Sequence, residues 1–461
     1  MTEGMRKFLF IWAGQLVSMT GTAMTRFALI TWAYQQTGQA TTLALMGFSA
    51  FILYVVFSPV AGVLVDRWDR RWVMFAADLA SGIMTALILL LYLSGSLEIW
   101  HLYIAEALTG AFDAFQLPAY SAAITTLVPK NQLGRVSGMR SLAYTSAQVL
   151  APALAGVVLA LFDLPGVLLI DLLTFGAALG TLALVRIPRP EKSSEGDQNS
   201  QESFWRQMTF GFHYITARPG LLGLLVIYMG INFAAALTYY GVMDAMVLSR
   251  TVGTDPQKTL ALASVKSALG AAGVVGGLLL TAWGGPKRRT HGVLAFAAFS
   301  FLFGDFIMGI GRTPAAWVFA ALVSAFFVPF IVGCDRAIWH SKVAPDVQGR
   351  VFGVKFMFQQ AVMPLGYLLA GPLADRLFEP ALMPGGALEP TFGWLVGSGA
   401  GAGMGLMFVC TAFLGCVLSA AGYLFAAVRN VERDLPDYDH VLPGETLEGE
   451  VVTTARAEAP A

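Results

Sequence analysis

The stretch Gly62–Arg71, with the sequence GVLVDRWDRR, places two aspartates and three arginines in one short turn. Long apolar stretches precede and follow it, and a helix of about 20 apolar residues is enough to cross the hydrocarbon core of a bilayer. A dense group of Asp and Arg at one place between two membrane spans indicates contacts that form and break. The sequence therefore predicts a helical membrane protein with a moving part at this turn.

Apolar residues dominate the whole chain. They make up 56% of its 461 residues, charged residues only 13%, and the mean hydropathy is +0.65. A soluble domain of this length needs far more charge on its surface. Backbone groups inside a bilayer must satisfy one another, which favours helices over open strands. We predict an all-α integral membrane protein with twelve transmembrane helices, at 8–33, 42–64, 72–94, 100–121, 138–162, 165–186, 220–248, 262–283, 290–311, 315–341, 352–378 and 403–428.

The basic residues predict how the chain lies in the membrane. With twelve spans of alternating direction, 22 of the 29 Lys and Arg residues fall on one side and five on the other, while Arg26 and Arg336 fall within spans. Basic loops stay in the cytoplasm, so both termini are predicted there. The first span follows Arg6 and Lys7 but is too long for the apolar core of a signal peptide, so we expect the mature protein to keep it.

Charge and cysteine content argue against several kinds of partner. The formal net charge is zero, which gives no reason to expect nucleic acid as a partner. Cys334, Cys410 and Cys416 lie within predicted spans and lack the spacing of a metal site. We interpret them as packing residues and expect neither a metal nor another cofactor.

A polar segment divides the chain into two halves. It begins with EKSSEGDQNSQES, which is typical of a flexible linker, and continues with FWRQMTFGFHY, which predicts an amphipathic segment on the inner membrane surface. The predicted domains are an N-terminal six-helix bundle at 1–186, this cytoplasmic linker with its interfacial segment at 187–219, a C-terminal six-helix bundle at 220–430, and a disordered cytoplasmic tail at 431–461.

The two halves show a weak internal repeat. Three matched pairs share one offset of 215 residues: Gly62 with Gly277, Arg135 with Arg350, and Gly156 with Gly371. Many secondary transporters consist of related six-helix halves that enclose a site at the bilayer midplane. We therefore predict two pseudo-symmetric six-helix bundles.

The charged turn resembles the loop between helices two and three of the major facilitator superfamily, whose pattern is roughly G-x-L-A-D-R-x-G-R-R/K. The matching residues are Gly62, Leu64, Asp66, Arg67, Arg70 and Arg71. Asp69 stands where the family usually has glycine. Asp66 could cap a neighbouring helix N-terminus, and the arginines could pair with acids of the opposite half, which would hold the cytoplasmic side closed. Asp78 is assigned to this cytoplasmic gate as a partner of the basic loops. The alternative is an ordinary basic loop.

Other stretches narrow the resemblance. APALAG at 151–156 resembles a degraded antiporter pattern, G-P-x-x-G-G, although close packing of small residues explains it equally well. WAGQLVSMTGTAMTRFALITW, QLPAYSAAITTLVP and GYLLAGPLADRLFEP resemble the macrolide-efflux and enterobactin-exporter branch of the superfamily. The resemblance implies export of a bulky hydrophobic or amphipathic molecule, such as a drug, macrolide or siderophore, in exchange for protons. It implies a monomer in a bacterial inner membrane.

Three ionisable residues within spans are the candidates for proton coupling, because such residues are costly in a bilayer and often mark transport pathways. Glu106 and Asp113 are seven residues apart and share one face of the fourth span. Arg26 of the first span lies at a similar depth, so we expect it to pair with one carboxylate while the other takes up the proton. Burial favours the neutral acid and Arg26 the ionised one. The alternative is a permanent ion pair that only fixes packing.

Polar stripes on three spans are the candidates for the substrate cavity, because the family fold implies that these helices line it. The residues are Gln15, Ser18 and Thr22 on the first span, Tyr120 on the fourth, and Tyr228, Asn232 and Tyr239 on the seventh. For the seventh span, a plain packing stripe explains the pattern equally well. Asp335 and Arg336 are interpreted as gate or turn residues. No role is assigned to Asp171 or Asp305.

Several other functions were weighed. A phosphate-binding Gly-rich loop with lysine is missing from the sequence, which argues against an ATP-driven pump. Catalytic patterns such as Ser/His/Asp, HExxH or Cys/His are missing too, so the chain is not expected to be an enzyme. A transporter of lysophospholipids or other lipids with the same fold, a nutrient importer, and a membrane sensor that transports nothing remain as alternatives.

Overall fold

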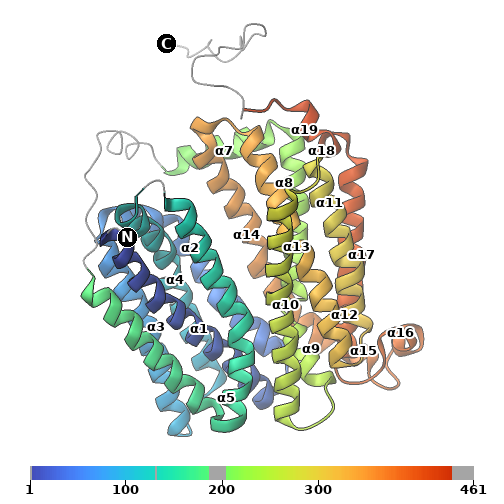
Figure 1. Ribbon diagram of the computed structural model, residues 1–461. Helices are drawn as coiled ribbons and strands as arrows, with labels where there is room; N and C mark the ends of the chain where they lie inside the picture. The colour runs from blue at the N-terminus through green and yellow to red at the C-terminus, as the bar shows by residue number, and fades with distance from the viewer. Residues whose placement is uncertain (1–2, 130–131, 186–203, 439–461) are drawn as a thin grey trace.

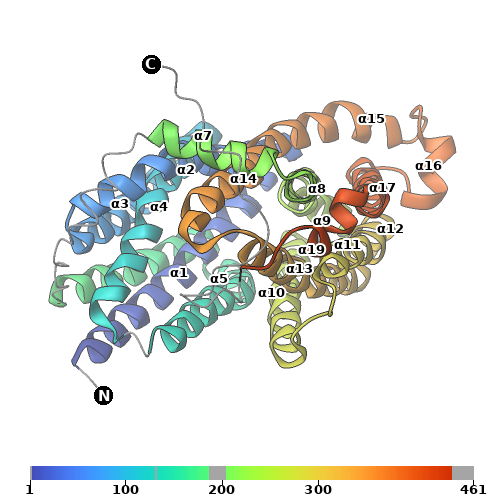
Figure 2. The same ribbon diagram turned by 90° about the horizontal axis from the view of Figure 1, so that it is seen from above.

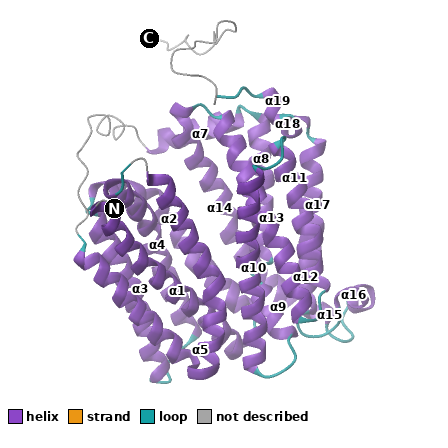
Figure 3. Cartoon of the chain, in the orientation of Figure 1, coloured by secondary structure: helices purple, strands orange, loops and turns teal. Residues whose placement is uncertain are grey.

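The computed structural model describes residues 3–129, 132–185 and 204–438, without the side chains of residues 59, 62–63, 66–67, 125 and 204–208. Every regular element in this part of the chain is a helix (Figures 1 and 3). The long helices run side by side as two groups, one from each half of the chain (Figure 2). The predicted all-α fold is confirmed.

The N-terminal half makes six passes with five helices, which are α1 (Glu3–Thr37), α2 (Ala40–Arg67), α3 (Arg70–Leu93), α4 (Ile99–Leu127) and α5 (Leu133–Leu184). The 52-residue α5 folds back on itself at Asp163, where φ is 53° and ψ is −166°. Neither this conformation nor the following Pro165 can continue one helix. Both ends of α5 therefore lie near the starts of α1 and α3, where Met139 accepts a hydrogen bond from Trp12 and Leu182 one from Arg71.

The C-terminal half makes its six passes with more broken helices. They are α7 (Phe204–Thr216), α8 (Pro219–Leu237), α9 (Met243–Arg250), α10 (Asp255–Trp283), α11 (Arg289–Phe299), η2 (Ser300–Asp305), α12 (Phe306–Ile310), α13 (Pro314–Lys342), η3 (Pro345–Val347), α14 (Gln348–Leu373), η4 (Ala374–Phe378), α15 (Glu379–Leu382), α16 (Glu389–Val396), α17 (Ala402–Leu424), α18 (Ala426–Arg429) and α19 (Val431–Asp434). The segments η2 and η4 are π-helical. Every predicted span overlaps at least one helix of the described residues.

Eight helices of the described residues are long and apolar enough to cross a membrane. The double-pass α5 is one of them, and α11, η2 and α12 together form another. Three further helices, α1, α4 and α14, are long enough to cross a membrane but are less apolar than these eight. Two of these, α1 and α4, carry the polar stripes predicted from the sequence. Their lower hydropathy is therefore a consequence of polar residues that face other helices and not lipid.

The bundle has two different ends. We call the end that carries α7 and α19 the basic end, and the end that carries α9, α15 and α16 the far end (Figure 1). Toward the far end one hydrophobic core contains residues of both halves, such as Met24 and Met246. Toward the basic end each half has a core of its own, around Phe8 in one and Trp339 in the other. The halves are therefore joined chiefly toward the far end.

A polar contact reinforces this junction. The carboxylate of Asp375, in η4, accepts hydrogen bonds from the backbone N–H groups of Ala40 (3.0 Å) and Thr41 (2.8 Å) at the start of α2. These are unsatisfied donors at the positive end of a helix dipole. Close approach of the two helices depends on Gly371, because a Cβ there would lie 2.3 Å from Thr41 Cα. Asp375 and Gly371 together form what we call the far-end junction.

Replacing Asp375 with alanine is expected to weaken closure of the far end. Losing the cap of a helix costs about 1 kcal/mol, which shifts an equilibrium between two conformations about fivefold. Spin labels at the exposed Gln36 and Ala387 would report the distance across the far end. Asp255→Ala is the matched control, since Asp255 contacts only Lys258 of its own helix, at 3.8 Å, among its ion pairs. An unchanged distance distribution in Asp375→Ala would contradict the assignment.

The predicted linker at 187–219 includes the helix α7. This helix lies across the basic end (Figure 2) and packs on α14, with the rings of Phe212 and Phe358 5.8 Å apart. A Cβ on Gly211 would lie 2.6 Å from Val354, so the two helices are in close contact. Residues 186–203 lie outside the described part of the chain. Within the described part, α7 belongs to the C-terminal half, and its position on a membrane surface stays a prediction.

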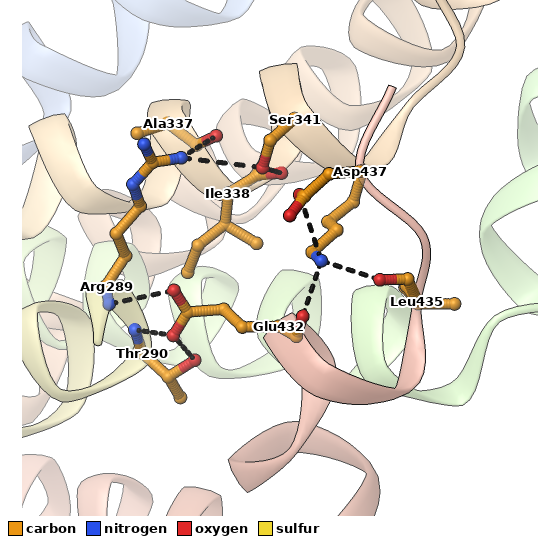
Figure 4. A network of polar contacts seen from close by, with 9 residues as sticks. Arg289, Thr290, Ala337, Ile338, Ser341, Glu432, Leu435 and Asp437 are labelled. Atoms are coloured by element: carbon orange, nitrogen blue, oxygen red, sulfur yellow. Dashed lines mark hydrogen bonds and ion pairs between the residues drawn. The ribbon is translucent and has the colours of Figure 1, made fainter. Parts of the chain in front are cut away.

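The disordered tail was predicted to begin at residue 431, but the structure places residues 431–438 against the C-terminal bundle. Val431, the first residue of α19, is fully buried. The helix lies along the ends of α11 and α13 (Figure 4). The carboxylate of Glu432 accepts hydrogen bonds from the backbone N–H groups of Arg289 (3.0 Å) and Thr290 (2.8 Å). The ammonium group of Lys342 donates to Leu435 O, at 2.6 Å. Residues 431–438 are therefore part of the C-terminal bundle, while 439–461 lie outside the described residues.

Replacing Glu432 with alanine is expected to destabilise the C-terminal half. The substitution leaves the first N–H groups of α11 without their carboxylate cap, which costs about 0.5–2 kcal/mol. Thermal unfolding of the purified protein in detergent would measure the loss. Asp434→Ala is the control, because Asp434 pairs only with the exposed Arg433 beside it, and exposed pairs contribute little. Equal melting temperatures for Glu432→Ala and the unmodified protein would refute the capping role.

Candidate functional site

A cavity of about 780 Å³ lies between the halves, mostly against the N-terminal half. It extends along α1 from Trp12, near the basic end, to Ile30. Residues from α2, α3, α4 and both arms of α5 complete its wall, and the C-terminal half contributes Lys266 and Arg336. The far-end core lies at the deep end of this cavity, since Phe27 belongs to both.

The predicted stripe on α1 lines this cavity. Gln15, Ser18, Thr22 and Arg26 all contribute to its wall, as does Tyr120 of α4. Their spacing of three and four residues places them on one face of the helix. The first span therefore presents its polar face to the space between the halves.

The charged group at mid-depth contains the three predicted proton-coupling residues. Arg26 Nη2 lies 3.3 Å from Glu106 Oε2, and the Arg26 side chain is 48% exposed while that of Glu106 is 12% exposed. Asp113 follows Glu106 on the same face of α4 and lines the cavity. Arg26 therefore pairs with Glu106 in this conformation, and Asp113 lines the cavity without an ion pair to a described residue.

Asp78 lies elsewhere than predicted. It is 3% exposed and accepts hydrogen bonds from Gln15 Nε2, at 2.7 Å, and from Gln116 Nε2. Asp78 also forms part of the cavity wall. Its assignment to the gate with the basic loops is therefore wrong. The side-chain amides of one residue on α1 and one on α4 bind its carboxylate and hold it in the cavity wall.

Some cavity residues were missed or differently interpreted from the sequence. Gln116 follows Asp113 by three residues, so extending the stripe of α4 would have found it. Arg140, to which the sequence gave no role, lines the cavity with its guanidinium 5.1 Å from the centre of the Tyr120 ring. Lys266 pairs with Asp244 at 2.7 Å, a contact between two helices that spacing along the chain cannot reveal.

The three candidates on the seventh span lie outside this cavity. The side-chain amide of Asn232 donates to the backbone carbonyl of Gln359, at 2.8 Å, and so fixes α8 to α14. Tyr239 packs edge-to-face on Phe408, with ring centres 5.3 Å apart, and Tyr228 packs against the core of the C-terminal half. Among the described residues these side chains form packing contacts, which was the alternative reading of that stripe.

Comparison with known proteins identifies the fold and the family. The sequence pattern of the Major Facilitator Superfamily matches residues 11–367. The chain belongs to this superfamily. Macrolide efflux protein A of Streptococcus pyogenes is 29% identical over 382 residues, which cover 80% of this chain and 90% of that protein. Multidrug efflux pump Tap of Mycobacterium tuberculosis is 26% identical over 356 residues, which cover 73% of this chain and 79% of Tap.

Solved structures share the arrangement of helices at low sequence identity. A bacterial homologue of the human lysosomal transporter Spinster, solved in an inward-facing and unoccupied conformation, has a TM-score of 0.68 at 16% identity and covers 92% of this chain and 98% of its own. The nucleoside transporter NupG has a TM-score of 0.63 at 11% identity and covers 90% of this chain and 98% of its own. Family and fold together are those of an integral membrane transporter and not of an enzyme.

The charged turn of this superfamily member makes contacts within its own half. Arg70 Nη1 donates to Ala122 O, at 2.9 Å, and Arg71 Nε donates to Leu182 O, at 2.7 Å, so both guanidinium groups bind carbonyls near helix C-termini, where the dipole favours cations. Asp69 caps α3 through the N–H of Arg71. Among the described residues, Arg70 and Arg71 form no ion pair with an acid of the opposite half, because the two halves are joined chiefly toward the far end.

The remaining gate candidates cannot be placed in this way. The surroundings of Gly62 and the side chains of Asp66 and Arg67 lie outside the described residues. The capping role of Asp66 therefore stays a prediction. Asp69, at the position where the family pattern has glycine, caps α3.

Proposed function

We propose that this protein exports a bulky hydrophobic or amphipathic small molecule in exchange for protons, by alternating access. The observation that carries the proposal is the cavity wall that holds Arg26, which pairs with Glu106, and the carboxylate of Asp113. Its volume of about 780 Å³ falls in the range of about 300–1,000 Å³ that suits drug-sized ligands. The names of the relatives, macrolide efflux protein A and multidrug efflux pump Tap, support export over import.

The orientation belongs to the same proposal. The excess of basic residues at the end with α7 and α19 supports a cytoplasmic location for that end and for both termini, in a bacterial inner membrane. The cavity reaches Trp12 near this end, while the core shared by the halves lies toward the other. We assign this conformation as inward-facing, ready to take substrate from the cytoplasm or inner leaflet.

Coupling to protons is proposed to run through Asp113. The carboxylate of Glu106 is already matched by Arg26, so exchange of a proton at that site would break an ion pair. Asp113 faces the cavity without that pairing and can lose a proton to cavity water or to the cytoplasm. Substrate that fills the cavity would then compete with the protonated state, which couples the two ligands.

Aromatic and basic side chains in the wall support an amphipathic cargo. Trp12, Tyr54, Tyr120 and Tyr144 supply flat apolar surface. Arg336 also lines the cavity and forms no ion pair with another described residue. An unpaired guanidinium suits an acidic head group, so a lysophospholipid is the second candidate cargo.

Transport by the purified protein in proteoliposomes tests the proposal. Candidate macrolides, cationic dyes, siderophores and lysophospholipids would be added with and without an imposed pH gradient. Gradient-dependent movement of a macrolide, dye or siderophore is the expected result. Movement of lysophospholipid alone would favour the second candidate. Gradient-independent movement would refute proton coupling, and movement of none of them would favour a sensor.

A further inference from the structure

We infer that Asp171 is a second proton-binding site, which exchanges its proton with the cavity through the hydroxyl of Thr22. This inference rests on the proposed proton-coupled function and deepens it. The sequence analysis gave Asp171 no role. Asp171 lies on the second arm of α5, outside the cavity wall, and is 0% exposed.

Threonine hydroxyls from three helices surround this carboxylate. Thr22 Oγ1 of α1 lies 3.4 Å from Asp171 Oδ1, and Thr85 Oγ1 of α3 lies 3.2 Å from Oδ2. The hydroxyl of Thr174 lies 3.4 Å from Oδ1 but donates at 2.8 Å to the backbone carbonyl of Asp171. Neutral hydroxyls are thus its polar neighbours on every side.

No cationic side chain of the described residues forms an ion pair with Asp171. A permanently ionised carboxylate in such a place is expensive. A hydroxyl can rotate to donate or accept a hydrogen bond. The surrounding threonine hydroxyls can therefore accept a hydrogen bond from the neutral carboxylic acid. After the acid has lost its proton, they can donate hydrogen bonds to the carboxylate. The same arrangement of helices therefore suits both protonation states.

Thr22 connects this buried group with the cavity. Its side chain lines the cavity wall and also contacts Asp171. The connection depends on close packing of α1 on α5, because a Cβ on Gly21 would lie 2.2 Å from Thr174 Oγ1 and 2.8 Å from Asp171 Oδ1. In the transfer, Asp171 gives its proton to Thr22 Oγ1, whose own proton passes to water in the cavity, and the carboxyl group becomes a carboxylate.

Asp305 provides a matched comparison. It is 1% exposed, lies in η2 of the other half, and has Thr411 Oγ1 at 3.3 Å. The nearby Tyr239 and Thr411 belong to packed helices, and neither lines the cavity described above. Among the described residues, neither of these neighbours of Asp305 lines the cavity as Thr22 does for Asp171. Asp305 is therefore not expected to exchange its proton with the cavity.

Infrared difference spectroscopy of the full-length protein in detergent tests the inference without any transported substrate. Spectra recorded at acidic and alkaline pH should contain a carboxylic-acid band that is lost in Asp171→Asn and retained in Asp305→Asn. In Thr22→Val, which keeps the acid, the band should remain but its hydrogen–deuterium exchange should slow. If Asp171→Asn leaves every titrating carboxyl band in place, or if Thr22→Val exchanges as fast as the unmodified protein, the inference is overturned.

This outcome separates the inference from the proposed function. A titrating Asp171 in a protein that moves no substrate against a proton gradient would refute the exporter and leave the proton site standing. Proton-coupled export with unchanged titration in Asp171→Asn would do the reverse. Thr22→Val also covers the case in which Asp171→Asn fails to fold.

Discussion

Replacing Asp113 with asparagine is expected to abolish proton-coupled transport while leaving substrate exchange intact. The amide keeps the size and polarity of the side chain but cannot release a proton, so the carrier can still bind substrate and change conformation without coupling. Arg26 and Glu106 stay paired at 3.3 Å, which preserves the cavity wall. Uptake driven by a pH gradient should fall to the level of empty liposomes, and exchange of labelled for unlabelled substrate should persist.

The matched control is Asp255→Asn, an acid at the N-terminus of α10 whose ion pair is with Lys258 of its own helix. It should transport like the unmodified protein. If Asp113→Asn retains proton-coupled transport and Glu106→Gln loses it, the coupled proton binds to Glu106 and not to Asp113. Loss of both coupled uptake and exchange in Asp113→Asn would show that Asp113 serves binding or folding and not coupling.

Replacing Gly371 with valine is expected to prevent closure of the far end and to stop transport. The first added carbon would lie 2.3 Å from Thr41 Cα, a backbone atom of the opposite half, so the halves must separate to accept it. Overpacking costs about 1–3 kcal/mol, and 3 kcal/mol shifts a two-state equilibrium on the order of 100-fold. Spin labels at Gln36 and Ala387 should show a longer distance.

Gly353→Val on the same helix is the control, because a Cβ there meets no atom within 4 Å. It should preserve both transport and the distance across the far end. If Gly371→Val transports normally, then either the junction of α2 and α14 is not needed for the cycle or the backbone moves easily enough to admit the side chain. Either result would remove the far-end junction from the account.

The parts of this molecule that could be predicted from the sequence are those fixed by periodic patterns. Apolar runs gave the passes of the chain, because a bilayer leaves helices as the way to satisfy backbone groups. Steps of three and four residues placed Gln15, Ser18, Thr22 and Arg26 on one face of α1, and the structure puts that face in the cavity wall. Such patterns depend on one helix at a time.

The contacts that could not be predicted depend on which helix lies next to which. Arg70 and Arg71 bind carbonyl groups of α4 and α5, and these partners cannot be predicted from the residues around the two arginines. Asp78 was assigned to the gate because basic loops are near in sequence, whereas two glutamine amides are nearer in space. The tail was predicted from its charges, but the burial of Val431 and the cap by Glu432 hold its first residues.

The central claim is that substrate and protons move in opposite directions through one cavity. The most direct test loads proteoliposomes with a transported compound, imposes no pH gradient, and follows internal pH as the compound flows out. The account predicts that protons enter the liposomes as substrate leaves, and that this movement is lost in Asp113→Asn. Outflow of the compound with no change in internal pH in the unmodified protein would contradict the claim.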